Sequence, residues 1–255
     1  MLLFDNNKVL RIVKSIMTGT NENSPGPELR GCALIPAYCE ERRIGAVVRE
    51  TLGHIRPVIV IDDGSPDGTA AEAEKAGATV LRHEKNKGKG AALNTGFAYA
   101  AERGYDFVIT LDADGQHAPA DIPRFIEAFL AGGAPALVGN RMGAPAGMPL
   151  VRKLTNHLMS WFLSREMGQK VPDTQSGFRL YARAALPFLA ADSAAFAAES
   201  ETLLRLSAHG IKIGSVPISV IYDDEKSKIR PVRDTIRFFR MIRCFRRSRR
   251  APAGR

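Results

Sequence analysis

The chain has 255 residues, enough for one large α/β domain, and its apolar content of 45% and charged content of 25% are those of a globular protein. Its three cysteines form no CxxC pair, which favours a reducing compartment and argues against a structural zinc site. The net charge of +9 is concentrated from Lys228 onward, where eleven Lys and Arg accompany one acid, so a nucleic-acid-binding domain with a spread basic surface is excluded and we expect no nucleic-acid partner.

Residues 1–30 precede the regular part of the chain. Apolar residues at positions 9, 10, 13, 16 and 17 form a short amphipathic pattern, and a turn-rich stretch containing Pro25-Gly26-Pro27 follows it. Polar residues interrupt the opening apolar run, so we expect no signal peptide, and no later apolar stretch is long enough to predict a transmembrane segment. We therefore predict an N-terminal amphipathic segment and linker over residues 1–30.

Strands and helices alternate from residue 31 to residue 140. The predicted strands cover residues 31–36, 57–61, 78–82, 107–111 and 136–139, and the predicted helices cover residues 40–54, 70–76, 90–103 and 121–130. The strands are apolar throughout, as expected when helices cover both faces of a sheet. This pattern predicts an α/β fold with a mainly parallel, Rossmann-like sheet, whose ligands bind beyond the carboxyl ends of the strands.

The pattern changes after Gly143, and we interpret the later residues, up to 227, as the second half of one domain spanning residues 31–227. A loop is expected over residues 142–149, then a helix over 151–166, a strand over 178–181, helices over about 184–190 and 199–209, and a β-like run over 212–221. No internal repeat is present.

Residues 228–255 form a basic tail with amphipathic helical character. Arginines at positions 233, 237, 240, 243 and 247 cluster on one side of a helical wheel, and the apolar residues at 238, 239, 241, 242 and 245 occupy the other. Such a helix suits the surface of an anionic membrane. A helix that packs its aromatic face on its own domain, or a solubilising tail, remains an alternative.

Two acids one residue apart, Asp112 and Asp114, directly follow the apolar run 107–111. Neighbouring carboxylates at the end of a buried strand can share a divalent cation, and hard oxygen ligands suit Mg²⁺ or Mn²⁺ with a diphosphate completing the shell. A solvated acidic turn is the alternative, but the preceding strand and the following Gln116 favour a metal site.

Polar residues also follow the first two predicted strands. Asp62 and Asp63 can accept hydrogen bonds from a ribose or a base, although their sequence context also fits a plain turn. Tyr38 can stack on a base and Glu40 can accept from it, although acids at a helix N-terminus are common for electrostatic reasons alone.

Together these segments resemble glycosyltransferase family 2 on a GT-A fold, and most of all its dolichyl-phosphate mannose synthase and polyprenyl-phosphate glycosyltransferase branch. The resemblance covers about residues 31–240. It extends to Asn86-Lys87-Gly88-Lys89-Gly90, Gly139-Asn140-Arg141, Asp173-Thr174-Gln175-Ser176-Gly177-Phe178-Arg179, Val216-Pro217-Ile218 and Lys226-Ser227-Lys228. Position 115 departs from the pattern, because it is Gly where relatives often carry a larger residue, and we expect this only to loosen the turn.

The resemblance implies a role for each matching residue. The base is held by Pro36, Ala37, Tyr38 and Glu40, and the base or ribose by Asp62 and Asp63. The diphosphate lies against Asp112, Ala113 and Asp114, and Mg²⁺ or Mn²⁺ is held by Asp112, Asp114 and Gln116. The acceptor phosphate is received by Arg141 and Arg152, with Ser176 of the acceptor-side motif, and Lys226 or Lys228 closes over the donor. Asp112, Asp114 and Arg141 are then the catalytic residues.

The implied reaction moves a sugar from a UDP- or GDP-sugar to a polyprenyl or dolichyl phosphate by an inverting in-line displacement. A phosphate is already an anion at neutral pH, so no side-chain base is needed. A sugar hydroxyl acceptor would need one, for which Asp173, Glu199 and Glu201 are candidates, and the last two cannot both face the site from one helix. A non-catalytic nucleotide-binding protein is a third hypothesis. The expected location is cytoplasmic, peripherally bound to the cytoplasmic face of a membrane.

Overall fold

The computed structural model describes residues 29–143, 150–190, 196–219, 238, 240–243 and 245–246. The predictions for the N-terminal segment, for Lys226 and Lys228, and for most of the basic tail lie outside the described residues. Arg152 belongs to a described helix, but its side chain also lies outside the described part of the chain.

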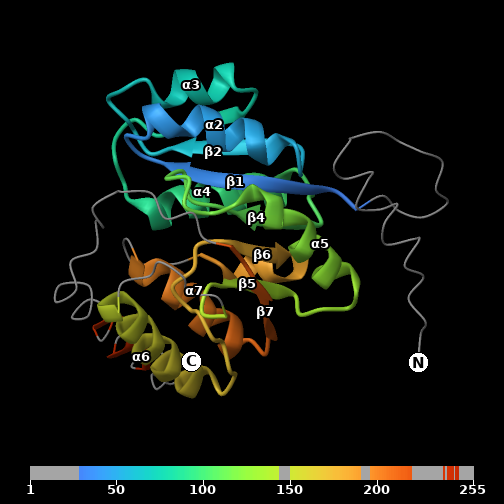
Figure 1. Ribbon diagram of the computed structural model, residues 1–255, viewed down its shortest axis with the longest axis vertical. Helices are drawn as coiled ribbons and strands as arrows, with labels where there is room; N and C mark the ends of the chain where they lie inside the picture. The colour runs from blue at the N-terminus through green and yellow to red at the C-terminus, as the bar shows by residue number, and fades with distance from the viewer. Residues whose placement is uncertain are drawn as a thin grey trace, which may run out of the picture.

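In the described part of the chain, seven strands form one sheet in the order β3-β2-β1-β4-β6-β5-β7 (Figure 1). Their bounds are β1 (Gly31–Ala37), β2 (Val58–Asp62), β3 (Thr79–Arg82), β4 (Phe107–Thr110), β5 (Ala136–Asn140), β6 (Arg179–Ala182) and β7 (Ile213–Pro217). The β6 strand runs antiparallel to both of its neighbours, and the other pairs are parallel. The predicted mainly parallel α/β fold is therefore confirmed.

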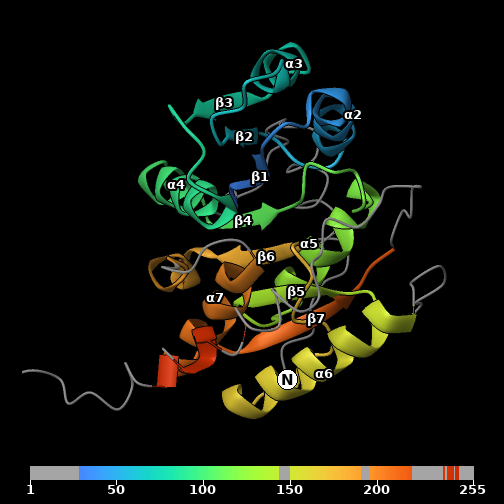
Figure 2. The same cartoon turned by 90° about the vertical axis from the view of Figure 1, so that its left-hand side faces the viewer.

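Helices cover both faces of the sheet, as the continuous apolar strands predict (Figure 2). On one face lie α2 (Glu41–Leu52), α3 (Thr69–Lys75) and α5 (Ile122–Leu130), and on the other lie α4 (Lys89–Glu102) and α7 (Phe196–Ala208). The α6 helix (Leu150–Met167) packs on α7 at the end of the molecule near β7 (Figure 2). Short 3₁₀ helices occur at Pro119–Asp121 and Arg183–Phe188. The second corrects the ordinary helix predicted near residues 184–190, because Pro187 lies inside it and cannot donate to an α-helical ladder.

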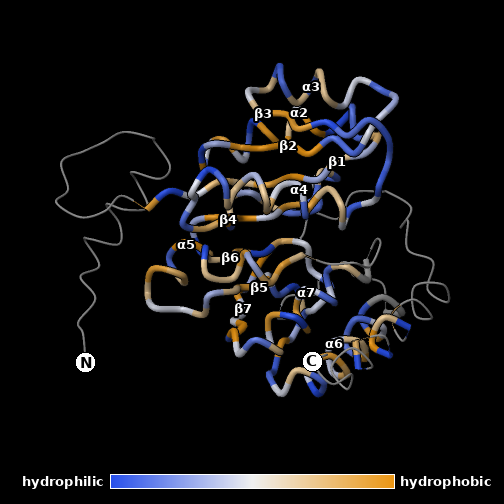
Figure 3. Tube along the Cα trace, turned by 180° about the vertical axis from the view of Figure 1, so that it is seen from behind, coloured by the Kyte–Doolittle hydropathy of each residue, from blue (hydrophilic) through white to orange (hydrophobic). Residues whose placement is uncertain are grey.

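The core is built from alternate residues of each central strand. In β1, Ala33 and Ile35 pack into the apolar cluster under α2 and α5, and Cys32 and Leu34 pack into the cluster under α4 and α7. Both clusters consist of buried residues, and the central strands β1, β2 and β4 are mostly hydrophobic (Figure 3). None of the helices described by the structure is both long and apolar enough to span a membrane.

The topology brings the ends of β1, β2 and β4 to one edge. The chain moves from β1 outward to β2 and β3 and then returns to β4 on the other side of β1. Ligands of such sheets bind beyond the carboxyl ends of the strands where the order reverses. In register, Ala37 lies beside Asp62 and Leu34 beside Thr110, so the loops after all three strands meet there.

The described residues of the C-terminal tail are helical and pack against the domain. Phe238, Met241 and Ile242 are buried, and the Phe238 ring lies 6.3 Å from the ring of Phe162 on α6. Their apolar side faces the protein because α6 and α7 offer it an apolar surface to cover. The prediction that this side lies on a membrane is therefore wrong for these residues, and the alternative of packing on the domain holds.

Candidate active site

The loops after β1 and β2 are tied to each other by backbone-to-side-chain hydrogen bonds. Cys39 N donates to Ser65 Oγ at 3.0 Å, and Glu40 N donates to Thr69 Oγ1 at 2.9 Å. Tyr38 follows the last residue of β1 and precedes Cys39. This tyrosine is 44% exposed, which is unusual for a large aromatic residue at a sheet edge. Pro36 and Ala37 are the last residues of β1, so they and Tyr38 form one wall of the edge.

Asp62, the last residue of β2, is fully buried and only half satisfied. Its Oδ1 accepts from Ser65 N at 3.1 Å. Its Oδ2 lies 3.1 Å from Arg82 Nε, yet no group in the described part of the chain donates a hydrogen bond to it. The Arg82 charge offsets part of the burial cost, but the oxygen still lacks a hydrogen-bond donor, so this atom is suited to a ligand that brings an N–H or O–H.

Asp63, the residue after β2, is hydrogen-bonded to the loop that leads into α4. Its Oδ1 is 2.7 Å from His83 Nδ1 and accepts from Lys87 N at 2.9 Å, and its Oδ2 accepts from Gly88 N at 2.7 Å. The carboxylate is buried and holds the loop that leads into α4. We therefore assign Asp63 a role in shaping that loop, and its contact with a base or ribose stays a prediction.

The turn after β4 holds the two acids predicted to bind a cation. Gln116 N donates to Asp114 Oδ1 at 3.0 Å, and Asp112 N donates to His117 Nδ1 at 3.2 Å. Gly115 sits between them with a φ of 74°, a left-handed conformation that glycine adopts without strain. Burial lowers the pKa of His117 more than Asp112 and Asp114 raise it, so the ring is neutral and its Nδ1 can accept.

Lys89, the first residue of α4, lies between two carboxylates from other parts of the fold. Its Nζ is 2.5 Å from Asp112 Oδ1 and 2.7 Å from Glu199 Oε1 on α7. Burial lowers the pKa of Lys89, but Asp112 and Glu199 together raise it above its usual value. Burial likewise raises the pKa of Asp112, and the Lys89 charge overcomes this and holds it at about 2. Lys89 and Asp112 therefore stay charged at neutral pH.

A glycine allows this cluster to close. A Cβ on Gly177 would lie 2.8 Å from both carboxylate oxygens of Asp112 and 3.0 Å from Glu199 Oε1. Sequence reasoning placed Lys89 in a motif but gave it no role. Lys89 and Asp112 are 23 residues apart, a separation that carries no helical or strand periodicity. Only the packing of α4 and α7 beside β4 brings the cluster together.

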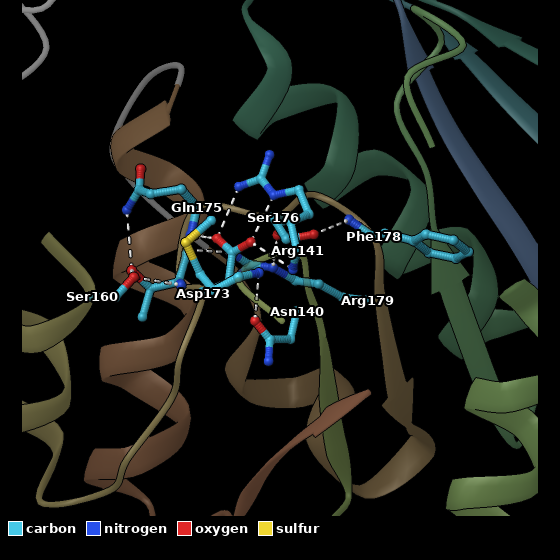
Figure 4. Close-up of polar contacts among 10 residues, drawn as sticks. Asn140, Arg141, Ser160, Asp173, Gln175, Ser176, Phe178 and Arg179 are labelled. Atoms are coloured by element: carbon cyan, nitrogen blue, oxygen red, sulfur yellow. Dashed lines mark hydrogen bonds and ion pairs between the residues drawn. The ribbon is translucent and has the colours of Figure 1, made fainter. Parts of the chain in front are cut away.

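On the other half of the edge, Arg141 follows β5 and forms a two-pronged pair with Asp173 (Figure 4). Arg141 Nε donates to Asp173 Oδ2 at 2.6 Å and Nη2 donates to Oδ1 at 2.8 Å. The Asp173 side chain is completely buried and that of Arg141 is 8% exposed. This geometry fixes the plane of the guanidinium at the position where the sequence predicts an acceptor phosphate to bind.

The loop after Asp173 is largely buried and is fixed by hydrogen bonds within the protein. Ser176 is fully buried, and its hydroxyl accepts from Phe178 N at 3.4 Å (Figure 4). Arg179 Nε donates to Ser176 O at 2.7 Å and its Nη2 donates to Thr174 O at 2.9 Å. Ser176 therefore has a structural role in the loop, and its contact with an acceptor phosphate stays a prediction.

Comparisons with known proteins now decide the family. The model of "Glycosyl transferase family 2" matches residues 32–189. The chain belongs to this family. It is 36% identical over 214 residues to a UDP-N-acetylglucosamine--dolichyl-phosphate N-acetylglucosaminyltransferase of Methanococcus voltae (75% of this chain, 85% of the relative), and 32% identical over 211 residues to the polyprenol monophosphomannose synthase of Mycolicibacterium smegmatis (76% and 78%).

Solved structures give the same fold. Glucosyl-3-phosphoglycerate synthase from Mycobacterium tuberculosis, crystallised with Mn²⁺, UDP and phosphoglyceric acid, superposes with a TM-score of 0.65 at 19% identity over 91% of this chain and 78% of its own. The resemblance seen in the sequence motifs is confirmed: this protein is a family 2 glycosyltransferase with a GT-A-like fold.

A family 2 glycosyltransferase that acts on a hydroxyl needs a side-chain base, and the three candidates are all engaged. Asp173 is paired with Arg141, Glu199 with Lys89, and Glu201 Oε1 lies 2.6 Å from Arg205 Nη2. Glu199 and Glu201 point in different directions, as their spacing on α7 predicts.

The acids of the turn after β4 also fit a divalent cation. Among the described residues, no three His, Cys, Asp or Glu side chains come together as a complete metal cage. Asp112, Asp114 and the amide of Gln116 instead offer hard oxygen ligands on one turn. Mg²⁺ is commonly held by one or two carboxylates together with waters and substrate phosphates, so this donor set fits a cation that binds with a diphosphate.

Proposed function

We propose that this glycosyltransferase moves a sugar from a UDP- or GDP-sugar to a polyprenyl or dolichyl phosphate. The observation that carries the proposal is that Asp173, Glu199 and Glu201, the candidate bases, are each in an ion pair. An acceptor that is already an anion needs none of them. The names of two relatives, a dolichyl-phosphate N-acetylglucosaminyltransferase and a polyprenol monophosphomannose synthase, support the same acceptor class.

The nucleotide would bind at the ends of β1 and β2. We assign the base to the wall formed by Pro36, Ala37 and Tyr38, with Glu40 at its outer end. The unsatisfied Asp62 Oδ2 supports this placement, because a base or ribose would bring the hydrogen-bond donor that the buried oxygen lacks. Lys226, which the resemblance places over the donor, remains part of the proposal.

The diphosphate would lie against Asp112, Ala113 and Asp114. A divalent cation held by Asp112, Asp114 and Gln116 would neutralise the charge that develops on the leaving diphosphate. The Lys89 ammonium supplies a second positive charge beside this site, since it is in direct contact with Asp112. When a phosphate arrives, Lys89 can turn from its carboxylate partners toward it without a change in protonation.

The acceptor phosphate would face Arg141. Asp173 holds the Nε and Nη2 edge of its guanidinium, so the cation is oriented before the acceptor binds. Arg152 is assigned to the same phosphate from the resemblance alone. The acceptor oxygen then attacks the sugar carbon in line with the departing diphosphate, and the configuration at that carbon inverts.

A two-step experiment tests the proposal. Thermal unfolding with UDP, GDP and their sugars, each with and without Mn²⁺, should show a cation-dependent rise in Tm for one nucleotide, because a ligand that binds the native state stabilises it. The preferred sugar nucleotide should then label a polyprenyl phosphate, and a chelator should abolish the transfer. Transfer that a chelator leaves untouched, or no transfer to lipid phosphates with any donor that binds, would contradict the proposal.

Transfer to a sugar hydroxyl of a glycan or lipid-linked saccharide is the competing function. One observation favours it: Glu199 is in the same charged cluster as Asp112 and would become a base if it released Lys89. Glu199→Gln would then abolish transfer to hydroxyls and remove the acidic limb of the pH profile. Under our proposal the same variant keeps substantial transfer to lipid phosphate. We also propose that the enzyme works at the cytoplasmic face of the membrane that carries its acceptor.

A further inference from the structure

The outer side of α6 carries a row of large apolar side chains that nothing in the described part of the chain covers. Leu154, Leu158 and Trp161 follow one another at spacings of four and three residues, so they form one stripe on the helix. They are 74%, 60% and 60% exposed, and the opposite side of α6 is buried at Asn156 and Leu163. Figure 3 shows α6 at the periphery of the fold, with hydrophobic and hydrophilic residues interleaved.

Basic side chains border the stripe. Arg165, one turn beyond Trp161, is exposed, and so are Arg240 and Arg243 of the C-terminal helical residues. Figure 2 shows the C-terminal helical segment beside α6. Within this contact, Arg246 pairs with Glu166 of α6. Glu166 is the only acid on α6 and is taken up by this pair. The surface therefore combines exposed apolar groups with a positive rim.

We infer that this face of α6 docks on the surface of an anionic lipid bilayer. Leucine and tryptophan enter the boundary between headgroups and acyl chains, and the basic rim meets the headgroup charge. A second copy of the chain fits less well, because a symmetric contact through this stripe would place the two positive rims against each other. The membrane contact thus belongs to α6, and the neighbouring C-terminal residues contribute charge while their apolar side stays buried.

The position of α6 links docking to the candidate site, a consequence that rests on the proposed function. On its inner side, the Ser160 hydroxyl accepts from Thr174 N at 2.9 Å, and Thr174 directly follows the Asp173 that orients Arg141. Docking through the outer side would hold this loop near the bilayer surface, where a lipid phosphate resides.

The chain contains a single tryptophan, so Trp161 reports directly on this face. The full chain is mixed with phosphatidylcholine vesicles that contain or lack phosphatidylglycerol, and fluorescence and vesicle flotation are measured together. We expect co-flotation with the anionic vesicles, a blue shift of the Trp161 emission, and quenching by brominated acyl chains. High salt should weaken the binding, because it screens the rim.

Matched variants separate this face from the rest of the surface. Leu154→Ser combined with Leu158→Ser should weaken vesicle binding by about tenfold or more, since each removes apolar area that enters the bilayer. Arg165→Glu with Arg240→Glu should weaken binding to anionic vesicles only. The control, Arg42→Glu with Arg49→Glu, makes the same charge change on exposed residues of α2 and should leave binding unchanged.

Three results would overturn the inference. They are no flotation with anionic vesicles, flotation without a change in Trp161 emission, and a blue shift that follows protein concentration in the absence of vesicles, which would indicate a second copy. The transfer reaction is assayed separately with a short-chain prenyl phosphate in detergent. Loss of that reaction with intact docking would contradict only the proposed function, and intact transfer without docking would contradict only this inference.

Discussion

Two ion pairs at the carboxyl edge of the sheet join similar charged groups but differ in how far they are exposed to solvent. The side chains of Lys89 and Asp112 are 25% and 26% exposed, whereas those of Arg141 and Asp173 are 8% and 0% exposed. A partly exposed pair can exchange its partner for a ligand at little cost, because water and ligand charges replace the lost contact. A buried pair cannot, since an exchange would strand a charge in the interior. The proposed donor side is therefore adaptable, and the proposed acceptor side is fixed before ligands bind.

The largest expected effect comes from the adaptable pair. Asp112→Asn would remove a ligand of the proposed cation, and we expect kcat/KM for transfer to fall by about a thousandfold or more. The free energy of unfolding at neutral pH should fall by only about 1 kcal/mol, because Lys89 keeps Glu199 as a partner. Steady-state kinetics and urea unfolding measure the two quantities. Glu50→Gln, on the exposed side of α2, is the control, and a parental rate in Asp112→Asn would refute the assignment.

The fixed pair should respond in stability. Asp173→Asn leaves the buried Arg141 without its carboxylate, and we expect the free energy of unfolding to fall by about 3 kcal/mol. The exposed pair between Lys75 and Glu72 offers a matched comparison: Glu72→Gln should cost about 0–1 kcal/mol. Equal losses in the two variants would show that burial does not separate the two kinds of pair.

Gly177→Ala tests how tightly the adaptable cluster is packed. The added methyl group would lie 2.8 Å from both Asp112 carboxylate oxygens, so the side chain must move away from the ligand position. We expect about a tenfold loss in kcat/KM, on the order of 1.4 kcal/mol, with a weaker response to Mn²⁺. Gly143→Ala, where a Cβ meets nothing within 4 Å, should retain activity. An active Gly177→Ala enzyme with an unchanged cation requirement would argue against the packed cluster.

The smallest effect is a pH dependence of stability. The Asp112 pKa lies at about 2, below its usual 3.8, so its ionised form stabilises the native state above pH 3.8 and this contribution disappears as the pH falls toward 2. The unfolding free energy of the parent minus that of Asp112→Asn should therefore decrease over this range. We expect a change on the order of 1 kcal/mol, reduced by the partial exposure of the group. A difference that stays constant in urea titrations across this range would contradict it.

Much of the fold follows from local patterns. The apolar runs that become β1, β2 and β4, and the acids directly after them, are visible in the sequence because a strand buried on both faces must be apolar and must end in polar residues. The insertion of β6 between β4 and β5 is not visible, because strand order depends on contacts between distant segments. The same limit applies to the hydrogen bonds that Asp63 and Ser176 make to the chain, which no sequence pattern predicts.

The amphipathic segments show what a sequence pattern cannot predict, namely the partner of an apolar helix face. The helical wheel separates the buried Phe238 from the exposed Arg240 correctly, but an apolar stripe does not reveal whether it will meet protein or membrane. On α6, the same kind of stripe stays exposed at Leu158 and Trp161.

The sequence by itself determined the family, the mainly parallel α/β architecture and the acidic turn at Asp112, because these depend on residues that are close along the chain. Only the tertiary structure decided which charges meet. It placed Lys89 between Asp112 and Glu199 and buried Arg141 on Asp173, since such pairings join elements that pack together after distant parts of the chain have folded.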